Sequence, residues 1–261
     1  MHKALSFWAA LACLWTASLM AEPARAQSAA DNVYVQALPA WADVLRNHVD
    51  DQGRIDFVGV QANPERLTEF VAAIAAVSPQ THPELFPERA QVLAYHINAY
   101  NALALQGVLD RDIPKGFTTF FKRASFFRLR GVVMGGETTN LYTYENQVIR
   151  PLDEPRTHFA LNCMVKDCPR LPQEPFLAAT LDAQLDAAAK EFFSSNKYLQ
   201  VDDQAKRAEV SSILKFYTKD FVASGKAQDL HVYINRYAPM AVPEDYKIRF
   251  IKYDWRLNAQ P

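Results

Sequence analysis

Glycine and cysteine are scarce in this chain, and neither sign of charge dominates it. Only 8 of 261 residues are glycine and 3 are cysteine, while 28 basic residues face 29 acidic ones, for a formal net charge of −1. The charge balance argues against nucleic acid or an anionic membrane as the partner, because both recruit proteins through an excess of Lys and Arg. Three cysteines are also too few for a disulfide scaffold, and no repeat or glycine-serine linker divides the chain.

The start of the chain has the layout of a secretory signal peptide over residues 1–26. Lys3 precedes an apolar run, and Ala24 and Ala26 supply small residues before a cleavage site. The run is shorter than the ~20 residues that span a bilayer, which disfavours an uncleaved anchor. Lipid attachment at Cys13 is a weaker alternative. We therefore expect cleavage near Ala26 and a periplasmic or secreted protein that has no membrane span after signal removal.

Residues 27–32 are predicted to form a short tether, and residues 33–258 a single domain. Apolar residues recur at helical spacing over 37–50, 63–77, 87–109, 140–152, 175–193, 211–222 and 229–238. Strand patterns and turn signals occupy 53–57, 125–141 (a hairpin), 156–163, 197–203, 207–213 and 246–258. Helices outnumber strands and do not alternate with them regularly, so we expect an α+β fold with helices packed on a small, mostly antiparallel sheet.

The stretch 87–109 is predicted to be the most buried helix, and its polar residues His96, Asn98 and Asn101 are candidates for the site. Asn98 and Asn101 are three residues apart and therefore share a face, with His96 nearby. Amides in an apolar helix are costly unless they are paired. They either bond to neighbouring backbone and fix the packing, or one of them contacts a substrate or orients a catalytic imidazole. Asn101 and His96 are the substrate-binding candidates.

The stretch HFALNCMVKDC, residues 158–168, holds one histidine and two cysteines. On a straight strand His158 and Cys163 point to opposite faces, whereas a turn can return Cys168 to His158. A thiol needs a nearby base or cation to become the reactive thiolate, so Cys168, or else Cys163, is the candidate nucleophile and His158 its base. A Cys163–Cys168 disulfide and a zinc site are alternatives, although H-x4-C-x4-C matches no common zinc pattern.

Glu145, in YENQVIRP, lies on a predicted short helix before the histidine and the cysteines. It is either a solvated helix residue or, like Asn98, a third group that holds the imidazole ring. The candidate catalytic set is therefore Cys168, Cys163, His158, Asn98 and Glu145. No cofactor and no metal is expected.

Five motifs along the chain resemble the DUF547 family, a domain of unknown function. They are GRIDFVGV, YHINAYNALAL, YENQVIRP, DEPRTHFALNCMVKDCPRLP and YDWRLN. The family usually has Phe-Trp before its Ile-Asn, where this chain has Tyr95 and His96. The resemblance implies an exported single-domain bacterial member, about 41–258, with a papain-like or transglutaminase-like core. The family's recurrent polar positions fall on Asn98, Asn101, Glu145, His158, Cys163 and Cys168.

These features predict a thiol-dependent hydrolase or acyltransferase that acts on amide or ester bonds in the cell envelope. The alternative is a non-catalytic domain that binds a small-molecule, peptide-like or protein ligand, with Cys163 and Cys168 joined as a disulfide. The two hypotheses differ in the state of the cysteines, because only a free thiol can act as a nucleophile.

Overall fold

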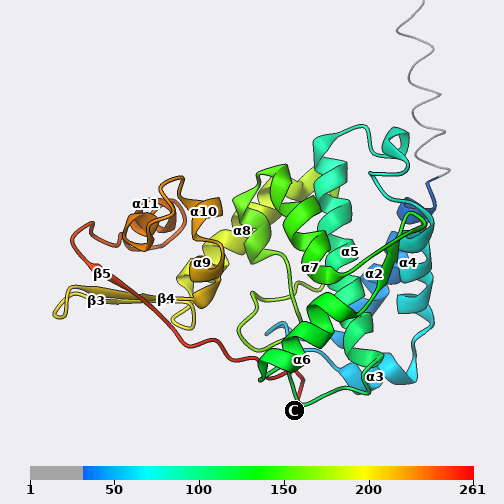
Figure 1. Cartoon of the computed structure of the whole chain (residues 1–261), viewed down its shortest axis with the longest axis horizontal. Coiled ribbons are helices and arrows are strands. Elements are labelled where there is room, and N and C mark those ends of the chain that lie inside the picture. Colours follow the sequence, from blue (N-terminus) through cyan, green and yellow to red (C-terminus); the bar gives the residue numbers. More distant parts are fainter. Residues whose placement is uncertain (1–31) are drawn as a thin grey trace, which may run out of the picture.

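The long helix α5 (Arg89–Leu109) forms the centre of the computed structural model, which describes residues 32–261 (Figure 1). It is buried along most of its length, and alanines at positions such as Ala94, Ala99 and Ala102 let neighbouring elements approach closely. Its first turn is capped by the side chain of Gln91, which accepts a hydrogen bond from the backbone N–H of Glu88 at 3.0 Å. The prediction of a buried helix over 87–109 is confirmed.

A first hydrophobic core surrounds α5 and includes α2 (Val33–His48) and α4 (Glu65–Ala76). The two helices pack together where the Trp41 ring stacks on Phe70, with ring centroids 5.6 Å apart and planes 8° apart. Asn32 caps α2 by accepting a hydrogen bond from Tyr34 N at 3.0 Å. The predicted signal peptide, and all of the predicted tether before Asn32, lie outside the described residues.

A second hydrophobic core lies on the other side of α8 (Leu181–Ser194). This amphipathic helix serves both cores: Leu181 and Leu185 pack in the first, and Phe192 and Phe193 pack in the second. In Figure 1, α8 lies between the group α2, α4, α5 and α7 and the group formed by α9, α10, α11 and the strands β3 to β5. The second core therefore extends the first through a shared helix.

The strands form two small sheets rather than one. β1 (Val132–Met134) and β2 (Glu137–Thr139) make an antiparallel hairpin. β3 (Leu199–Asp202) pairs antiparallel with β4 (Arg207–Val210), and β4 pairs parallel with β5 (Lys247–Phe250). The fold is a single-domain α+β fold with mostly antiparallel strands, as predicted.

The remaining helical elements are short. The α-helices are α3 (Phe57–Ala62), α6 (Phe120–Ala124), α7 (Leu141–Tyr144), α9 (Ser212–Phe216), α10 (Thr218–Phe221) and α11 (Leu230–Ile234). The π-helical turns are η2 (Ser125–Leu129) and η3 (Glu145–Ile149). The 3-10 turns are η1 (Pro83–Leu85), η4 (Arg150–Leu152), η5 (Pro155–Phe159), η6 (Ala178–Thr180) and η7 (Ala227–Asp229). Within residues 32–261, no helix has the length and apolar character that crossing a bilayer requires.

Several strand predictions are wrong in part or in full. The stretch 53–57 is not a regular strand, because Ile55 makes only isolated bridges and α3 begins at Phe57. The stretch 156–163 is not a strand, because Pro155 begins the 3-10 turn η5 and the chain after it is irregular. The predicted hairpin over 125–141 is confirmed only for β1 and β2, since its first part forms the π-helical turn η2. His158 and Cys163 therefore do not lie on opposite faces of a strand, as was predicted.

Residues 251–261, which follow β5, form an extended segment that returns to the first core and that we call the strap (Figure 1). Only β5 of the predicted strand 246–258 is regular, and the rest makes isolated bridges at Arg256, Leu257 and Ala259. The strap runs beside the loop that holds the cysteines, because Lys166 N donates to the backbone oxygen of Arg256 at 2.8 Å. It brings the aromatic residues after β5 to the junction of the two cores.

Candidate active site

A small cavity of about 70 Å³ brings together four of the residues identified in the sequence: Glu145, His158, Cys163 and Cys168. It lies at the junction of the two cores, since Cys168 packs in the first core and Ile213 in the second. Aromatic side chains supply much of the remaining wall: Tyr100, Phe127, Phe216, Tyr217, Tyr253 and Trp255.

A tight turn places the two thiols side by side. The side chain of Asn162 accepts a hydrogen bond from Met164 N and donates one to the backbone oxygen of Pro169, both at 2.7 Å. Met164 adopts a left-handed conformation with φ of 68°, which reverses the chain direction. Both cysteines are free, and their sulfur atoms lie 2.7 Å apart.

The surroundings of the two thiols favour ionisation of Cys168. Burial by itself would raise the pKa of Cys168, but hydrogen bonds from the Cys163 thiol, the Val165 and Cys163 backbones and the Tyr253 hydroxyl outweigh burial and lower it. The Cys163 N–H lies 3.1 Å and the Tyr253 Oη 3.6 Å from Cys168 Sγ. The pKa of Cys163 is raised by its hydrogen bond to Cys168, by burial and by the charge of Glu145. Of the two thiols, Cys168 is therefore the one that loses its proton more readily.

His158 sits on η5 and is held by an acid and an aromatic ring. Its Nε2 lies 2.8 Å from Asp220 Oδ2, and its ring stacks on Tyr217 with centroids 4.0 Å apart and planes 18° apart. Asp220 also accepts two hydrogen bonds of 2.6 Å from Arg150. Burial acts to raise the pKa of Asp220, but Arg150 and His158 outweigh burial and hold it well below its usual range. The imidazole is thus fixed against a permanently charged carboxylate.

The second ring nitrogen of His158, Nδ1, is not engaged by Asp220. Among the described residues, no hydrogen bond links Nδ1 of His158 to another side chain or to either sulfur. The imidazole and the thiols therefore share the cavity wall without a direct bond between them. Catalytic hydrogen bonds are often long before substrate binds, so this geometry is compatible with a working pair.

Glu145 is buried, with 7% of its surface exposed, rather than solvated. It accepts hydrogen bonds from the hydroxyls of Tyr100, at 3.0 Å, and Tyr217. Burial and the charge of Glu145 both raise the pKa of Tyr217, so that this tyrosine keeps its proton and donates it. Glu145 consequently positions the ring on which His158 stacks.

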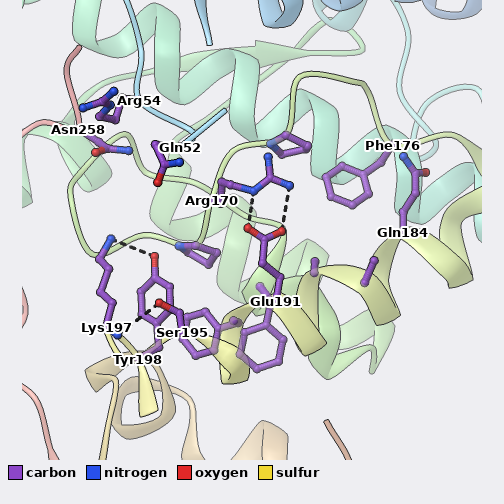
Figure 2. Close-up of a pocket in the computed structure, with 16 residues that line it drawn as sticks. Gln52, Arg54, Arg170, Phe176, Gln184, Glu191, Ser195, Lys197, Tyr198 and Asn258 are labelled. Carbon is purple, nitrogen blue, oxygen red and sulfur yellow. Dashed lines mark hydrogen bonds and ion pairs between the residues drawn. The ribbon is translucent and has the colours of Figure 1, made fainter. Parts of the chain in front are cut away.

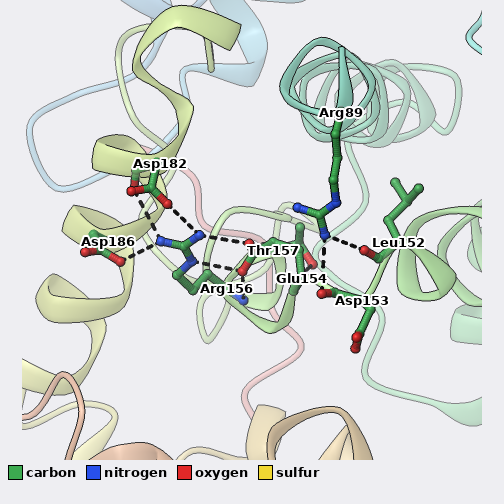
Figure 3. A network of polar contacts seen from close by, with 8 residues as sticks. All are labelled: Arg89, Leu152, Asp153, Glu154, Arg156, Thr157, Asp182 and Asp186. Atoms are coloured by element: carbon green, nitrogen blue, oxygen red, sulfur yellow. Dashed lines mark hydrogen bonds and ion pairs between the residues drawn. The ribbon is translucent and has the colours of Figure 1, made fainter. Parts of the chain in front are cut away.

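An arginine network fastens η5, the turn that carries His158, to α8 (Figure 3). Arg156 pairs with Glu154 at 2.8 Å, with Asp182 at 2.8 Å and with Asp186 at 2.6 Å. In Figure 3, Arg89 of α5 reaches the chain just before η5, where its guanidinium donates to the backbone oxygen of Leu152 at 2.6 Å. Contacts from α5 and α8 thereby hold the backbone that carries His158.

Asn98, Asn101 and His96 of α5 do not line the cavity wall. Asn101 donates to the Ala160 backbone oxygen at 3.0 Å and accepts from Asn162 N at 2.7 Å. Asn98 bonds to the backbone N–H and C=O of Phe176 at 3.0 and 2.7 Å. Both amides pair with backbone on the segments that surround the site.

His96 is also remote from the thiols. It is fully buried between Gln80, 3.1 Å from Nε2, and the Tyr144 hydroxyl, 2.8 Å from Nδ1. Burial lowers the pKa of His96 to about 3, so this imidazole is neutral at physiological pH. It stabilises the packing of α5 against α7.

Sequence reasoning missed Tyr217, Asp220 and Tyr253, which complete the surroundings of His158 and Cys168. Tyr217 and Asp220 lie in FYTKDF, whose pattern is that of any amphipathic helix. Their role depends on the packing of the second core against η5, and no local motif indicates that contact. The nearest signal is the cluster of aromatic residues in the final stretch, which includes Tyr253.

A larger cavity of about 470 Å³ is lined by residues that include Arg170, Glu191 and Tyr198 (Figure 2). Pro169 lines both cavities. The wall contains no histidine or cysteine, and its Arg170 and Glu191 already pair with each other. Tyr198 from this wall donates to the backbone oxygen of Cys168 at 2.6 Å and so supports the loop from behind.

Among the described residues, no group of three or more His, Cys, Asp or Glu side chains is arranged to hold a metal ion. The reactive groups in and beside the small cavity are two thiols, an imidazole bonded to a carboxylate, and tyrosine hydroxyls.

The comparison with protein families identifies the part of the chain that builds one side of this site. The model of the family described as "Protein of unknown function, DUF547" matches residues 85–193. The chain carries a DUF547 domain. The family predicted from the sequence is thus confirmed over these residues, although the motifs GRIDFVGV and YDWRLN fall outside the match. No curated protein and no solved structure matched the chain.

The DUF547 match contains α5, Glu145, His158 and both cysteines. The residues that hold His158 and Cys168 from the second core and the strap, namely Tyr217, Asp220 and Tyr253, lie beyond it. The cavity is therefore formed jointly by the DUF547 segment and by the chain that follows it.

Replacing Asn101 by Ala tests whether this amide supports the site. The change leaves the Ala160 carbonyl and the Asn162 N–H buried without their partner, so we expect the free energy of unfolding to fall by about 2–4 kcal/mol. Urea unfolding followed by circular dichroism measures the change. The exposed Asn196→Ala serves as the control, with an expected effect within about 0.5 kcal/mol. Equal effects of the two variants would show that the Asn101 bonds contribute nothing.

Replacing Tyr253 by Phe tests the origin of the Cys168 thiolate. The variant loses a donor to the sulfur, so the pKa of Cys168 should rise toward its ordinary value. Thiolate absorbance at 240 nm, recorded against pH, should shift to higher pH in Tyr253→Phe. Tyr246→Phe is the matched control, because that hydroxyl bonds to Asp203 instead. A shift to lower pH, or none, would contradict the assigned role of Tyr253.

Proposed function

We propose that this protein is a thiol-dependent hydrolase or acyltransferase that acts on amide or ester bonds. The observation that carries the proposal is the shared cavity, which both Cys168 and His158 line, with Asp220 bonded to the His158 ring. The lowered pKa of Cys168 supports the same assignment. Nucleophile, base and orienting acid are the three components that acyl transfer through a thioester requires.

In the first half-reaction, Cys168 gives its proton to His158 and the thiolate attacks the carbonyl carbon of the substrate. A C–S bond forms, and the carbonyl π electrons move to oxygen. Collapse of this intermediate breaks the bond to the leaving amine or alcohol, which takes the proton from the His158 imidazolium. A thioester on Cys168 and a neutral imidazole remain.

In the second half-reaction, His158 removes a proton from water or from an acceptor amine or alcohol. The acceptor attacks the thioester carbonyl and expels Cys168 as a thiolate, with the imidazolium beside it. Water as acceptor gives hydrolysis, and an amine or alcohol gives acyl transfer. Asp220 keeps the imidazole in one orientation throughout and stabilises its charged form.

The other residues of the site position these groups. Glu145 acts through Tyr217, which it holds by a hydrogen bond and which stacks on His158. Asn98 and Asn101 act through the backbone of the surrounding segments. In this scheme Cys163 is the donor to the Cys168 sulfur rather than the nucleophile.

A substrate can approach from a groove of about 470 Å³ beside the small cavity. The two share Phe127, Glu145, Phe216, Tyr217 and Trp255, so the groove adjoins the cavity along these side chains. Only a carbonyl group and its nearest atoms fit the 70 Å³ cavity, and the rest of the substrate would lie in the groove. A peptide-like substrate in the cell envelope, reached by export through the predicted signal peptide, remains part of this proposal.

The papain-like or transglutaminase-like core likewise remains a prediction from the family resemblance. In papain-like enzymes the nucleophile caps the central helix, whereas both thiols here lie on the loop after η5. The proposed chemistry rests on the cavity and does not depend on that fold.

Trapping of the acyl-enzyme tests the proposal. Incubation with p-nitrophenyl acetate should add one acetyl group to the protein, located on Cys168 by peptide mapping and removable by hydroxylamine. Cys168→Ser should lower the rate of p-nitrophenol release by at least roughly a hundredfold, because serine is a far weaker nucleophile at neutral pH. Cys163→Ser is the matched control and should retain acylation, because its hydroxyl can still donate to Cys168.

Two outcomes would contradict the thiol mechanism. Acylation that persists in Cys168→Ser would place the nucleophile elsewhere. Equal loss of acylation in both variants, together with equal loss of stability, would show that the cysteines act as a structural pair. The second result would favour the alternative function, a ligand-binding domain with a Cys163–Cys168 disulfide. The two sulfur atoms lie 2.7 Å apart, so a disulfide could join them.

A further inference from the structure

One segment of the chain is strongly basic, although the charges of the whole chain nearly balance. Residues 113–136 contain no Asp or Glu, and they contain five basic residues: Lys115, Lys122, Arg123, Arg128 and Arg130. The segment includes α6 and η2, which lie at the outer edge of the first core (Figure 1). A net charge of −1 for the whole chain therefore does not describe this region.

The same segment exposes large apolar side chains. Phe120, Phe121 and Leu129 are 70%, 81% and 80% exposed. The rings of Phe120 and Phe121 contact each other, with centroids 5.9 Å apart. Single exposed apolar residues are ordinary on protein surfaces, but three such residues on one ten-residue helical segment are not. We name Phe120, Phe121, Lys122, Arg128 and Leu129 the α6 surface.

Aromatic contacts keep guanidinium groups near this apolar surface. The Arg128 guanidinium lies 3.5 Å from the centroid of the Tyr142 ring, and that of Arg123 lies 4.9 Å from the centroid of Trp255. Among the described residues, neither of these guanidinium groups forms an ion pair, whereas Arg130 of the same segment pairs with Asp110. Exposed phenylalanines flanked by unneutralised cations match the chemistry of a peripheral membrane contact, in which rings enter the acyl boundary and cations meet lipid phosphates.

We propose that the α6 surface docks on anionic phospholipid membranes. The alternative of a second copy of this chain is disfavoured by charge, because a two-fold interface would set the basic residues of one copy against those of the other. Phospholipid phosphates supply the negative charge that the segment lacks, and the boundary of the acyl chains accepts the two phenylalanine rings. This contact lies on the surface of the bilayer and involves no spanning helix.

Docking in this orientation would bring the substrate groove to the membrane. Phe120, Arg123 and Arg128 belong to the basic segment and also line the groove that adjoins the cysteine cavity. A molecule held at the lipid surface would therefore meet the groove directly. The membrane contact itself does not depend on the proposed thiol chemistry, and each can fail without the other.

Vesicle flotation of the full chain tests the contact. Vesicles that contain phosphatidylglycerol and phosphatidylcholine should bind the protein more strongly than vesicles of phosphatidylcholine alone, and added salt should weaken binding. The double variant F120S/F121S should lower the partition coefficient by at least roughly tenfold, because two exposed rings no longer enter the interface. The variant K122E/R128E should abolish the preference for phosphatidylglycerol.

The controls separate this surface from other causes. V58S and M240S remove apolar side chains that are 68% and 65% exposed on other elements, and each should leave binding unchanged. All variants share residues 1–31, so any contribution of the N-terminal residues cancels. Circular dichroism checks that each variant is folded.

Three results would overturn the proposal. Undiminished binding of F120S/F121S would show that the rings do not insert. Binding lost only in K122E/R128E would reduce the contact to general electrostatic attraction. A wild-type dimer in sedimentation velocity that F120S/F121S dissociates, without vesicle binding, would identify the surface as a self-interface.

Discussion

Two buried amide side chains, those of Asn101 and Asn162, fix the backbone on which the candidate site depends. Asn101 joins α5 to residues 160 and 162, and Asn162 closes the turn between 164 and 169. Without these bonds, the segment between the two cores would carry unpaired backbone groups in a buried position. With them, an irregular stretch of chain becomes a fixed support that presents His158 at one end and the thiols at the other.

Charge is distributed on this support so that each buried ionisable group has a partner. Asp220 bonds to both Arg150 and His158. Glu145 accepts hydrogen bonds from two tyrosine hydroxyls, and Cys168 is surrounded by hydrogen-bond donors. Such arrangements are costly to bury and add little net stability, so they are more typical of functional sites than of structural ones. Tyr217 connects two of these groups, since it contacts both Glu145 and His158.

The parts of the fold that were predicted correctly are those with a local signal. Helical spacing identifies α5 and α8, and alternation with turn residues identifies β1–β2 and β3–β4. The segment 156–163 was mistaken for a strand because its apolar run resembles one, whereas Pro155 and side-chain hydrogen bonds determine its actual course. The sequence indicates that Asn98 and Asn101 are paired amides. It does not indicate their partners, because those partners lie 59 or more residues away in the sequence. The same limit hid Asp220, which meets His158 only through the packing of the second core.

The accessibility and ionisation of the two cysteines test the account most directly. The protein is treated briefly with iodoacetamide at neutral pH, with and without prior reduction, and peptide mapping distinguishes Cys163 from Cys168. The account predicts labelling of Cys168 without reductant and ahead of Cys163, because Cys168 lines the cavity and the pKa of its thiol is the lowered one of the pair. Labelling of neither cysteine until reductant is added would show that they form a disulfide, and would contradict a thiolate at the centre of the site.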